Sequence, residues 1–336
     1  MTSSIPGLGD LLPAHQSYAD RVDLPERLSA LDGDQLTDRA LRTAQLDLIA
    51  TRLGFDAHVF ALTDPCTGIV TSPHATVPMV PPTNLPRLIR RRYAAAGEKE
   101  WATVLAEFGV TDAMRVQLDD RWGTWGFLEL WRGSGRYSDE QRRWLTALGP
   151  LLTAQLRRSV ARTFTVPDEH RSTLESGVVL LDDDLEVRSV TSGAAEALMR
   201  LLPPTEPGPP VPATAYNVVA ALLAHEGGIH PGEPWARVNL GSNRWATVRA
   251  ERLDDRVAVS IGSSTTAERA DLFARANQLS PRETQVLQLA LHGMDTRAIA
   301  DDLVIAHSTA EDHLKALLAK TGSASRHQLL ARALGG

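Results

Sequence analysis

Residues 279–326, LSPRETQVLQLALHGMDTRAIADDLVIAHSTAEDHLKALLAKTGSASR, carry helix start and stop signals at short intervals. Pro281 suits the first position of a helix, where its missing N–H costs nothing, and this helix is expected to run to about His292. Gly293 and Gly322 are placed to end helices, because glycine readily adopts the left-handed conformation of a C-terminal cap. Three further helices are predicted over residues 296–303, 308–320 and 326–334. Short helices joined by brief turns are typical of a helix-turn-helix domain.

Apolar residues recur along these helices at the spacing of buried helix faces. The residues expected in this small core are Val286, Leu287, Ile299, Leu303, Leu314 and Leu317. On the third helix, Ala310 and His313 are expected to share the inner face with the two leucines. The opposite face of that helix is then left for solvent or a partner.

The same segment resembles the LuxR/NarL-type family of DNA-binding domains. The matching residues, in order and with the right gaps, are Leu279-Ser280-Pro281-Arg282-Glu283, Val286-Leu287, Gly293-Met294, Ile299-Ala300-Asp301-Asp302-Leu303, Thr309, His313-Leu314, Lys320, Gly322 and Ser325-Arg326. The resemblance implies that the third helix lies in the major groove of duplex DNA, where each base pair shows its own pattern of donors and acceptors. It also implies a pair between Glu283 and Arg326 that braces the first helix against the last; the alternative is two unrelated solvated charges.

The DNA-contacting residues implied by the resemblance lie on the second and third helices. They are Thr296, Arg297, Ser308, Thr309, Glu311, Asp312, Lys315 and Lys320. Lys315 matches a position that reaches base edges or phosphates, whereas the family usually has a basic residue at 311 and often an aliphatic one at 312. Glu311 is a candidate to accept from a cytosine amino group. The alternative, favoured for Asp312, is that both carboxylates are attracted by the dipole at the start of the helix.

Charge limits how this segment can bind DNA. From Ala270 onward seven basic residues face seven acidic ones, and the whole chain has a net charge of −6. Because phosphate contacts dominate non-specific affinity, a neutral domain is expected to bind weakly as a monomer and to depend on dimerisation.

The preceding part of the chain alternates between strand and helix patterns, so the predicted fold class is α+β. Residues 36–162 are expected to form a first domain, with a helix from Gln35 to Leu53, a proline-rich loop over 71–85, a hairpin around Gly126 and a long helix that Ser138 caps. This part resembles a GAF domain. Residues 167–265, with strands at 177–181, 235–240, 245–252 and 257–261, look PAS-like. Both resemblances imply an antiparallel sheet with helices to one side.

The predicted organisation is therefore a loose lead-in over residues 1–35, GAF-like and PAS-like antiparallel-sheet domains, a Gly/Ser/Thr linker at 262–266, and an all-α four-helix helix-turn-helix domain over 270–336. The proline-dense stretch 203–212 is expected to be a loop.

No catalytic or metal-binding pattern appears along the chain. Cys66 is the only cysteine and is expected to be a small packing residue. The histidines lack metal-ligand spacing, and Asp182-Asp183-Asp184 is expected to be a polar hairpin turn rather than a phosphoacceptor. Because neither a signal peptide nor an apolar run of about 20 residues is present, a cytoplasmic protein is expected.

The function expected from the sequence is transcription regulation, in which N-terminal sensory domains control a C-terminal LuxR-type helix-turn-helix. The expected partners are double-stranded DNA and a second copy of the chain, with a small-molecule or protein signal; no cofactor is named. The alternative is a signalling or protein-interaction module with weakened or lost DNA binding, motivated by the neutral charge and by Glu311 and Asp312.

Overall fold

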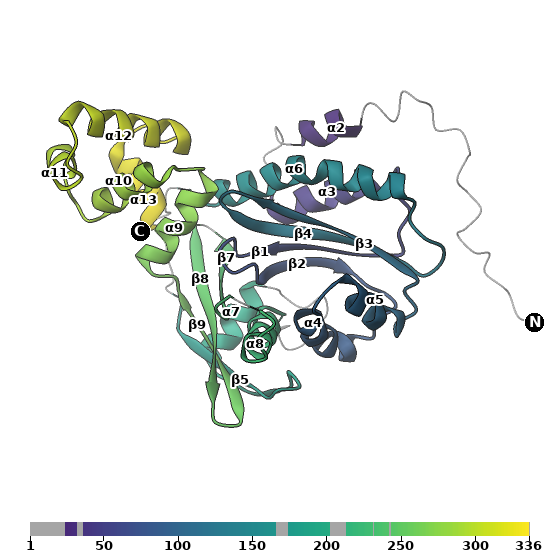
Figure 1. Ribbon diagram of the computed structural model, residues 1–336. Helices are drawn as coiled ribbons and strands as arrows, with labels where there is room; N and C mark the ends of the chain where they lie inside the picture. The colour runs from purple at the N-terminus through teal and green to yellow at the C-terminus, as the bar shows by residue number, and fades with distance from the viewer. Residues whose placement is uncertain are drawn as a thin grey trace, which may run out of the picture. The chain divides into compact units, whose positions relative to one another are not determined.

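The computed structural model describes residues 24–31, 36–165, 174–201, 213–230, 232–241 and 243–335 (Figure 1). The chain divides into two compact units, residues 1–53 and residues 54–336. The first unit contains α2 (Leu24–Ala30) and α3 (Asp38–Ala50), and Thr37 caps α3 by accepting from the Ala40 N–H. Helix α3 confirms the predicted helix, whereas α2 was not expected within the lead-in. The expected loop at 203–212 lies outside the described residues.

The second unit begins with an antiparallel sheet of four strands in the order β2-β1-β4-β3. The strands are β1 (Ala57–Thr63), β2 (Val70–Thr76), β3 (Asp112–Asp120) and β4 (Gly123–Arg132). The hairpin of β3 and β4 was predicted, but the loop predicted over 71–85 was wrong in its first part, which forms β2. Strand β2 lies at the sheet edge, and there Pro73 is tolerated because its missing N–H breaks no inner ladder.

Helices cover both faces of this first sheet. Helices α4 (Leu85–Ala94) and α5 (Glu98–Ala106) pack on one face, where Leu88, Trp101 and Trp131 share a core. The long helix α6 (Asp139–Arg162), capped by Ser138 as predicted, packs on the other, where Gly126 lets Leu156 approach closely. The expectation of helices on one side only was therefore wrong for this sheet.

A second antiparallel sheet has five strands in the order β6-β5-β9-β8-β7. Its strands are β5 (Gly177–Leu181), β6 (Val187–Val190), β7 (Trp235–Gly241), β8 (Arg244–Leu253) and β9 (Arg256–Ser263). The predicted strands are all present, and Asp182 forms the predicted turn by accepting from the backbone N–H groups of Asp184 and Glu186. Helix α7 (Ser192–Leu201) packs against β5 in the core of this sheet.

Helix α8 (Ala213–Glu226) joins the two sheets into one core. Its sequence ATAYNVVAALLAHE is apolar nearly all round, as expected for a helix buried on every side. One side contacts β8, and other sides contact α4 and β2, where Thr214 donates to the Thr71 carbonyl at 3.2 Å. Ile69 beside β2 belongs to the same core as the second sheet. The two sheets therefore share packed side chains around α8.

Five helices follow the second sheet (Figure 1). They are α9 (Thr266–Ala276), α10 (Pro281–Leu291), α11 (Thr296–Asp302), α12 (His307–Thr321) and α13 (Arg326–Leu334). The last four confirm the predicted helices to within two residues at each end. The predicted linker at 262–266 was wrong, because β9 extends to Ser263 and Thr265 caps α9 with Glu268 in a capping box. Strand and helix are thus joined almost directly.

Candidate nucleic-acid interface

Local caps set the bounds of α10, α11 and α12. Ser280 and Glu283 form a capping box at the start of α10, and Asp295 caps α11 by accepting from the Ala298 N–H at 2.8 Å. Gly322 ends α12 in the left-handed conformation, with φ of 61°. These residues fix three short helices whose buried faces meet in one small core; its fully or nearly fully buried members include Val286, Leu287, Ile299, Ala310, Leu317 and Leu329.

Glu283 and Lys320 tie α10 to α12. The Lys320 Nζ lies 2.7 Å from Glu283 Oε2, and Glu283 also accepts from the Ser280 backbone N–H. Burial alone raises the pKa of Glu283, but the Lys320 ammonium and the Ser280 hydrogen bonds outweigh it and lower this pKa. The expected pair between Glu283 and Arg326 was wrong, because Arg326 donates to the Met294 carbonyl instead. Glu283 is not a solvated charge either.

The turn between α11 and α12 has two unfavourable residues. Val304 has a φ of 52°, in the left-handed region that β-branched residues avoid, and the residue is 90% exposed. Ala306 occupies the N-cap of α12 and makes no side-chain cap hydrogen bond. The turn therefore lacks both a favourable backbone conformation at Val304 and a side-chain cap at Ala306.

The outer face of α12 is polar and exposed. Ser308, Asp312 and Lys315 follow one another at four- and three-residue steps on the side opposite Ala310 and Leu317. Thr309 and Glu311 are exposed beside them. The Asp312 carboxylate lies 3.7 Å from the Lys315 ammonium, and His307 Nδ1 lies 3.7 Å from the Glu311 carboxylate.

The helix start decides between two accounts of the acidic residues on this face. Helix α12 begins at His307 and has no acidic residue in its first turn. Glu311 and Asp312 therefore lie in the second turn, where attraction to the helix dipole has largely decayed. The dipole interpretation of Asp312 was wrong, and these carboxylates are left exposed beside the residues predicted to contact DNA.

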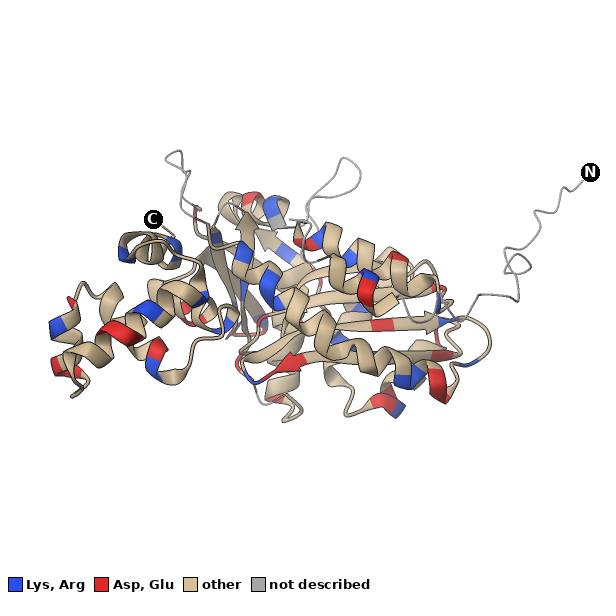
Figure 2. Cartoon of the chain, turned by 90° about the horizontal axis from the view of Figure 1, so that it is seen from above, with Lys and Arg blue, Asp and Glu red and all other residues tan. Residues whose placement is uncertain are grey.

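The remaining predicted contacts lie on α11 and at the end of α12. Arg297 is exposed and Thr296 half-buried in the first turn of α11. Lys320 is paired with Glu283. Within the part of the chain that the structure describes, it is the one predicted contact residue whose side chain already has a partner at hydrogen-bond distance. Figure 2 shows basic and acidic segments interspersed along these helices.

Comparison with known proteins agrees with this geometry. Residues 277–333 match the model of the bacterial regulatory proteins of the luxR family. These residues form a LuxR-family helix-turn-helix domain. The match covers α10, α11, α12 and all of α13 except its last residue, and it includes the eight predicted contact residues. No curated protein sequence matches the chain.

Solved structures similar to the chain include the following three. One describes the Vibrio cholerae VqmA dimer in the absence of target DNA, with 20% identity over 48% of this chain and 83% of that one, at a TM-score of 0.18. The second is the sensor region of a sensor histidine kinase, with 17% identity over 63% and 86%, at 0.18. The third is the Escherichia coli DhaR(N)–DhaL complex, with 14% identity over 75% and 91%, at 0.15. At these TM-scores none of the three establishes a shared fold.

Helix α9, which leads into the LuxR-family domain, is held by charged residues of both sheets. Arg237 on β7 is 1% exposed and grips Asp64, which is 0% exposed, through Nε at 2.7 Å and Nη2 at 2.9 Å. The same guanidinium donates to Asp271 at 2.8 Å and to the Glu268 carbonyl at 2.7 Å, both on α9. Burial opposes the charge of Arg237, but the Asp64 carboxylate outweighs it and raises the pKa of the guanidinium. Arg237 thus joins the β1–β2 loop, β7 and α9.

The tip of the β3–β4 hairpin holds the connection between α9 and the LuxR-family domain. The Trp122 carbonyl accepts from Arg275 Nη1 at 2.7 Å, and the Trp122 indole donates to the Leu279 carbonyl at 3.3 Å. Gln278 lies between these contacts with a left-handed φ of 57°. The bend between α9 and α10 is therefore fixed from the first sheet.

Cys66 lies beside this junction rather than in a core, so its expected role as a packing residue was wrong. Cys66 is an exposed residue, but its thiol packs 3.2 Å from Asp271 and 3.1 Å from Arg237. Partial burial raises the pKa of the thiol to about 11, and the nearby Arg237 charge offsets this only in part. At neutral pH the side chain is therefore a thiol and not a reactive thiolate.

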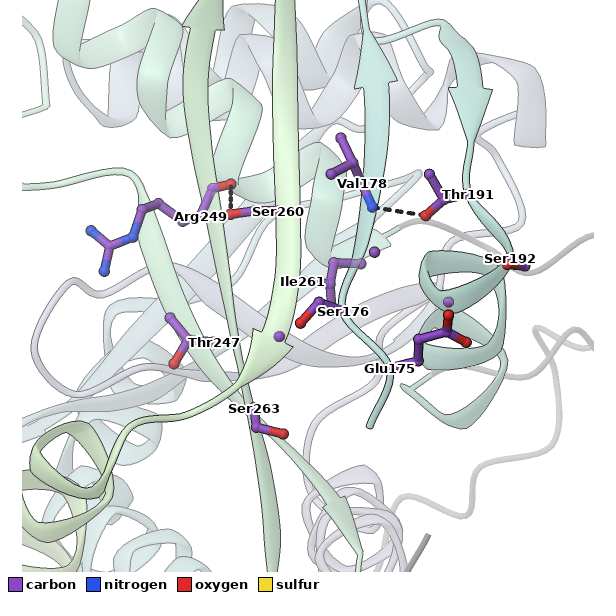
Figure 3. Close-up of a pocket in the computed structure, with 13 residues that line it drawn as sticks. Glu175, Ser176, Val178, Thr191, Ser192, Thr247, Arg249, Ser260, Ile261 and Ser263 are labelled. Atoms are coloured by element: carbon purple, nitrogen blue, oxygen red, sulfur yellow. Dashed lines mark hydrogen bonds between the residues drawn. The ribbon is translucent and has the colours of Figure 1, made fainter. Parts of the chain in front are cut away.

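A groove of about 380 Å³ lies on the second sheet, between β5, β8, β9 and the start of α7 (Figure 3). Hydroxyl groups line it, and one of them is already hydrogen-bonded: Thr191 accepts from the Val178 N–H at 2.9 Å.

Among the residues whose positions are described, no group of three or more His, Cys, Asp or Glu side chains is arranged to hold a metal ion. Within the same residues, no helix is both long and apolar enough to cross a bilayer.

Proposed function

We propose that the protein is a DNA-binding transcriptional regulator in which residues 54–263 control the LuxR-family domain. The observation that carries this proposal is the attachment of α9. This helix directly precedes α10 in the chain, and residues of both sheets bind it. Arg237 on β7 donates to Asp271, and the Trp122 carbonyl in the β3–β4 hairpin accepts from Arg275. We therefore expect a signal that moves either sheet to change the relative free energies of alternative positions of the LuxR-family domain.

The two antiparallel sheets support a sensory role for the N-terminal part, in keeping with its GAF-like and PAS-like sequence patterns. Their shared core around α8 couples them, so a signal at one sheet is felt at the other. We assign no reaction to this part: it acts as a control region and not as an enzyme. The protein is proposed to act in the cytoplasm, where its DNA lies.

The charge of the LuxR-family domain supports the proposal of a dimer. Seven basic and seven acidic residues after Ala270 leave little electrostatic attraction to phosphate. Two copies on a pair of half-sites gain affinity from the second contact without new charges. We therefore propose a homodimer as the DNA-binding species.

The coupling is tested with the full chain and a duplex recovered from it by selection. Asp271→Asn weakens the grip of Arg237 on α9, and we expect DNA affinity to change by at least about five-fold, in the range of typical coupling energies. Asp255→Asn, at an exposed turn, is the matched control and is expected to change affinity by less than two-fold. Equal affinities of wild type and Asp271→Asn would contradict control through α9.

A second candidate function is a signalling or protein-interaction module without DNA binding. It is favoured by the neutral charge of the LuxR-family domain and by the exposed carboxylates of Glu311 and Asp312. A salt titration separates the two candidates. The affinity of a DNA-binding protein falls as salt rises, and the slope of log affinity against log salt is proportional to the number of phosphates that it neutralises. A module that has lost DNA binding shows no affinity above that for competitor DNA at any salt concentration.

A further inference from the structure

The most exposed ion pair on α12 lies where DNA is proposed to bind. Asp312 and Lys315 have 76% and 74% of their side chains exposed, and their charged atoms lie 3.7 Å apart. Both follow Ser308 along the centre of the outer face of the helix. An ion pair this exposed contributes little to stability, so its residues are free to exchange solvent for another partner.

A G·C base pair offers the complementary arrangement. In the major groove guanine presents the acceptors N7 and O6, and cytosine presents the donor N4. Guanine O6 and cytosine N4 are hydrogen-bonded to each other, so they lie about 2.9 Å apart. A donor and an acceptor on one helix face, separated by a similar distance, fit these two edge atoms together.

We propose that Asp312 and Lys315 act as one unit that reads a single G·C base pair, with Lys315 donating to guanine and Asp312 accepting from the cytosine amino group. This inference rests on the DNA-binding function proposed above and adds the base pair that α12 selects. The carboxylate is the informative half of the unit. It is repelled by phosphates, and on α12 it lies beyond the turn in which the helix dipole stabilises an acid. A base amino group compensates both effects.

Glu311, the other acidic residue of this face, is not part of the proposed unit. Glu311 lies toward the flank, 3.7 Å from His307 Nδ1, whereas Asp312 lies on the outer face with Ser308 and 3.7 Å from Lys315. A T·A pair also presents a donor and acceptors, but guanine alone gives the lysine two adjacent acceptors. The unit is therefore expected to prefer G·C to T·A, and to prefer one orientation of the pair.

The test is selection of duplexes from a randomised pool by the full-length protein and its variants. Wild type is expected to enrich one G·C pair in each half-site. Asp312→Ala is expected to reduce the preference at that pair about ten-fold, and Asp312→Asn to admit adenine, the base that asparagine reads best. The exchange variant Asp312→Lys/Lys315→Asp is expected to invert the preference to C·G. Asp301→Asn, an exposed acid on α11, is the control and is expected to keep the wild-type preference.

The outcomes separate this inference from the function on which it rests. If wild type enriches no sequence, the proposed DNA-binding function fails and the inference fails with it. If wild type enriches a site but every Asp312 variant keeps the same base at every position, only the inference is overturned. Thermal melts of each variant show that it is folded, and these exposed positions are expected to leave the melting temperature unchanged.

Discussion

Two ion pairs of similar chemistry occupy opposite environments in this protein. Arg237 and Asp64 are almost completely buried where the two sheets meet α9, whereas Lys315 and Asp312 are about three-quarters exposed on α12. The first pair has no solvent to replace its partner, so removing either residue leaves a buried charge. The second pair is already solvated. Burial, and not the identity of the residues, therefore separates a pair that holds the structure from a pair that is accessible to a partner.

Breaking the buried pair is expected to have the largest effect on stability. Arg237→Ala leaves Asp64 buried without its bidentate partner and is expected to lower the free energy of unfolding by about 3–5 kcal/mol. Chemical denaturation of the full chain measures this. Arg256→Ala, whose guanidinium is exposed and 3.9 Å from Asp255, is the control and is expected to cost less than about 0.5 kcal/mol. A loss below 1 kcal/mol for Arg237→Ala would remove the basis of the comparison.

Breaking the exposed pair is expected to affect DNA binding and not stability. Lys315→Ala removes a base or phosphate contact and is expected to cost about 1–3 kcal/mol of binding free energy if the contact is to a base, or about one unit of the salt slope if it is to a phosphate. Affinity and salt dependence on one duplex measure it, with melts as a control. Lys99→Ala, an exposed lysine on α5, is expected to bind as wild type does. Equal DNA affinities of the two variants would contradict a DNA contact by Lys315.

The helices of the LuxR-family domain could be predicted because their signals are local. Ser280, Asp295 and Ser325 cap helices by bonding to N–H groups three residues ahead, and such patterns can be read directly from a sequence. The outer face of α12 could be predicted for the same reason, since it follows from the helical repeat of Ala310 and Leu317.

The contacts of Asp64 and Arg237 beside α9 could not be predicted, because these residues meet only in the folded chain. Asp64 and Arg237 are 173 positions apart, and neither has a neighbour in sequence that marks it as buried. Glu283 was matched to Arg326 from a family pattern, but the approach of α10 to α12 brings Lys320 closer. Strand β2 was missed because proline is read as a loop signal unless the strand is known to lie at an edge.

A half-buried pair gives an intermediate case. Lys320→Met removes the partner of Glu283, and we expect a loss of about 1–2 kcal/mol at pH 7. Because the pKa of Glu283 is lowered in the folded protein, its stabilising contribution is present at neutral pH. It is lost as the pH falls below the usual value for glutamate, about 4.3. Denaturation at pH 7 and at pH 3 is therefore expected to show a difference between wild type and Lys320→Met that shrinks in acid. A difference independent of pH would contradict the pairing.

The smallest expected effect concerns the uncapped start of α12. Ala306→Ser supplies the side-chain oxygen that the N-cap lacks and is expected to raise the free energy of unfolding by about 1 kcal/mol. Ala319→Ser, at an exposed site within the same helix, is the control and is expected to bring no gain. If both substitutions have the same effect, the N-cap of α12 does not limit the stability of the turn.

The exposed face of α12 is proposed to bind specific duplex DNA. The most direct measurement is the affinity of the full-length protein for its selected duplex and for a scrambled duplex of the same composition, over a range of salt concentrations. We expect both affinities to fall with salt, because phosphate contacts contribute to each, while the selected duplex remains bound at least about 1000-fold more tightly. Equal affinities for the two duplexes at moderate salt would contradict it.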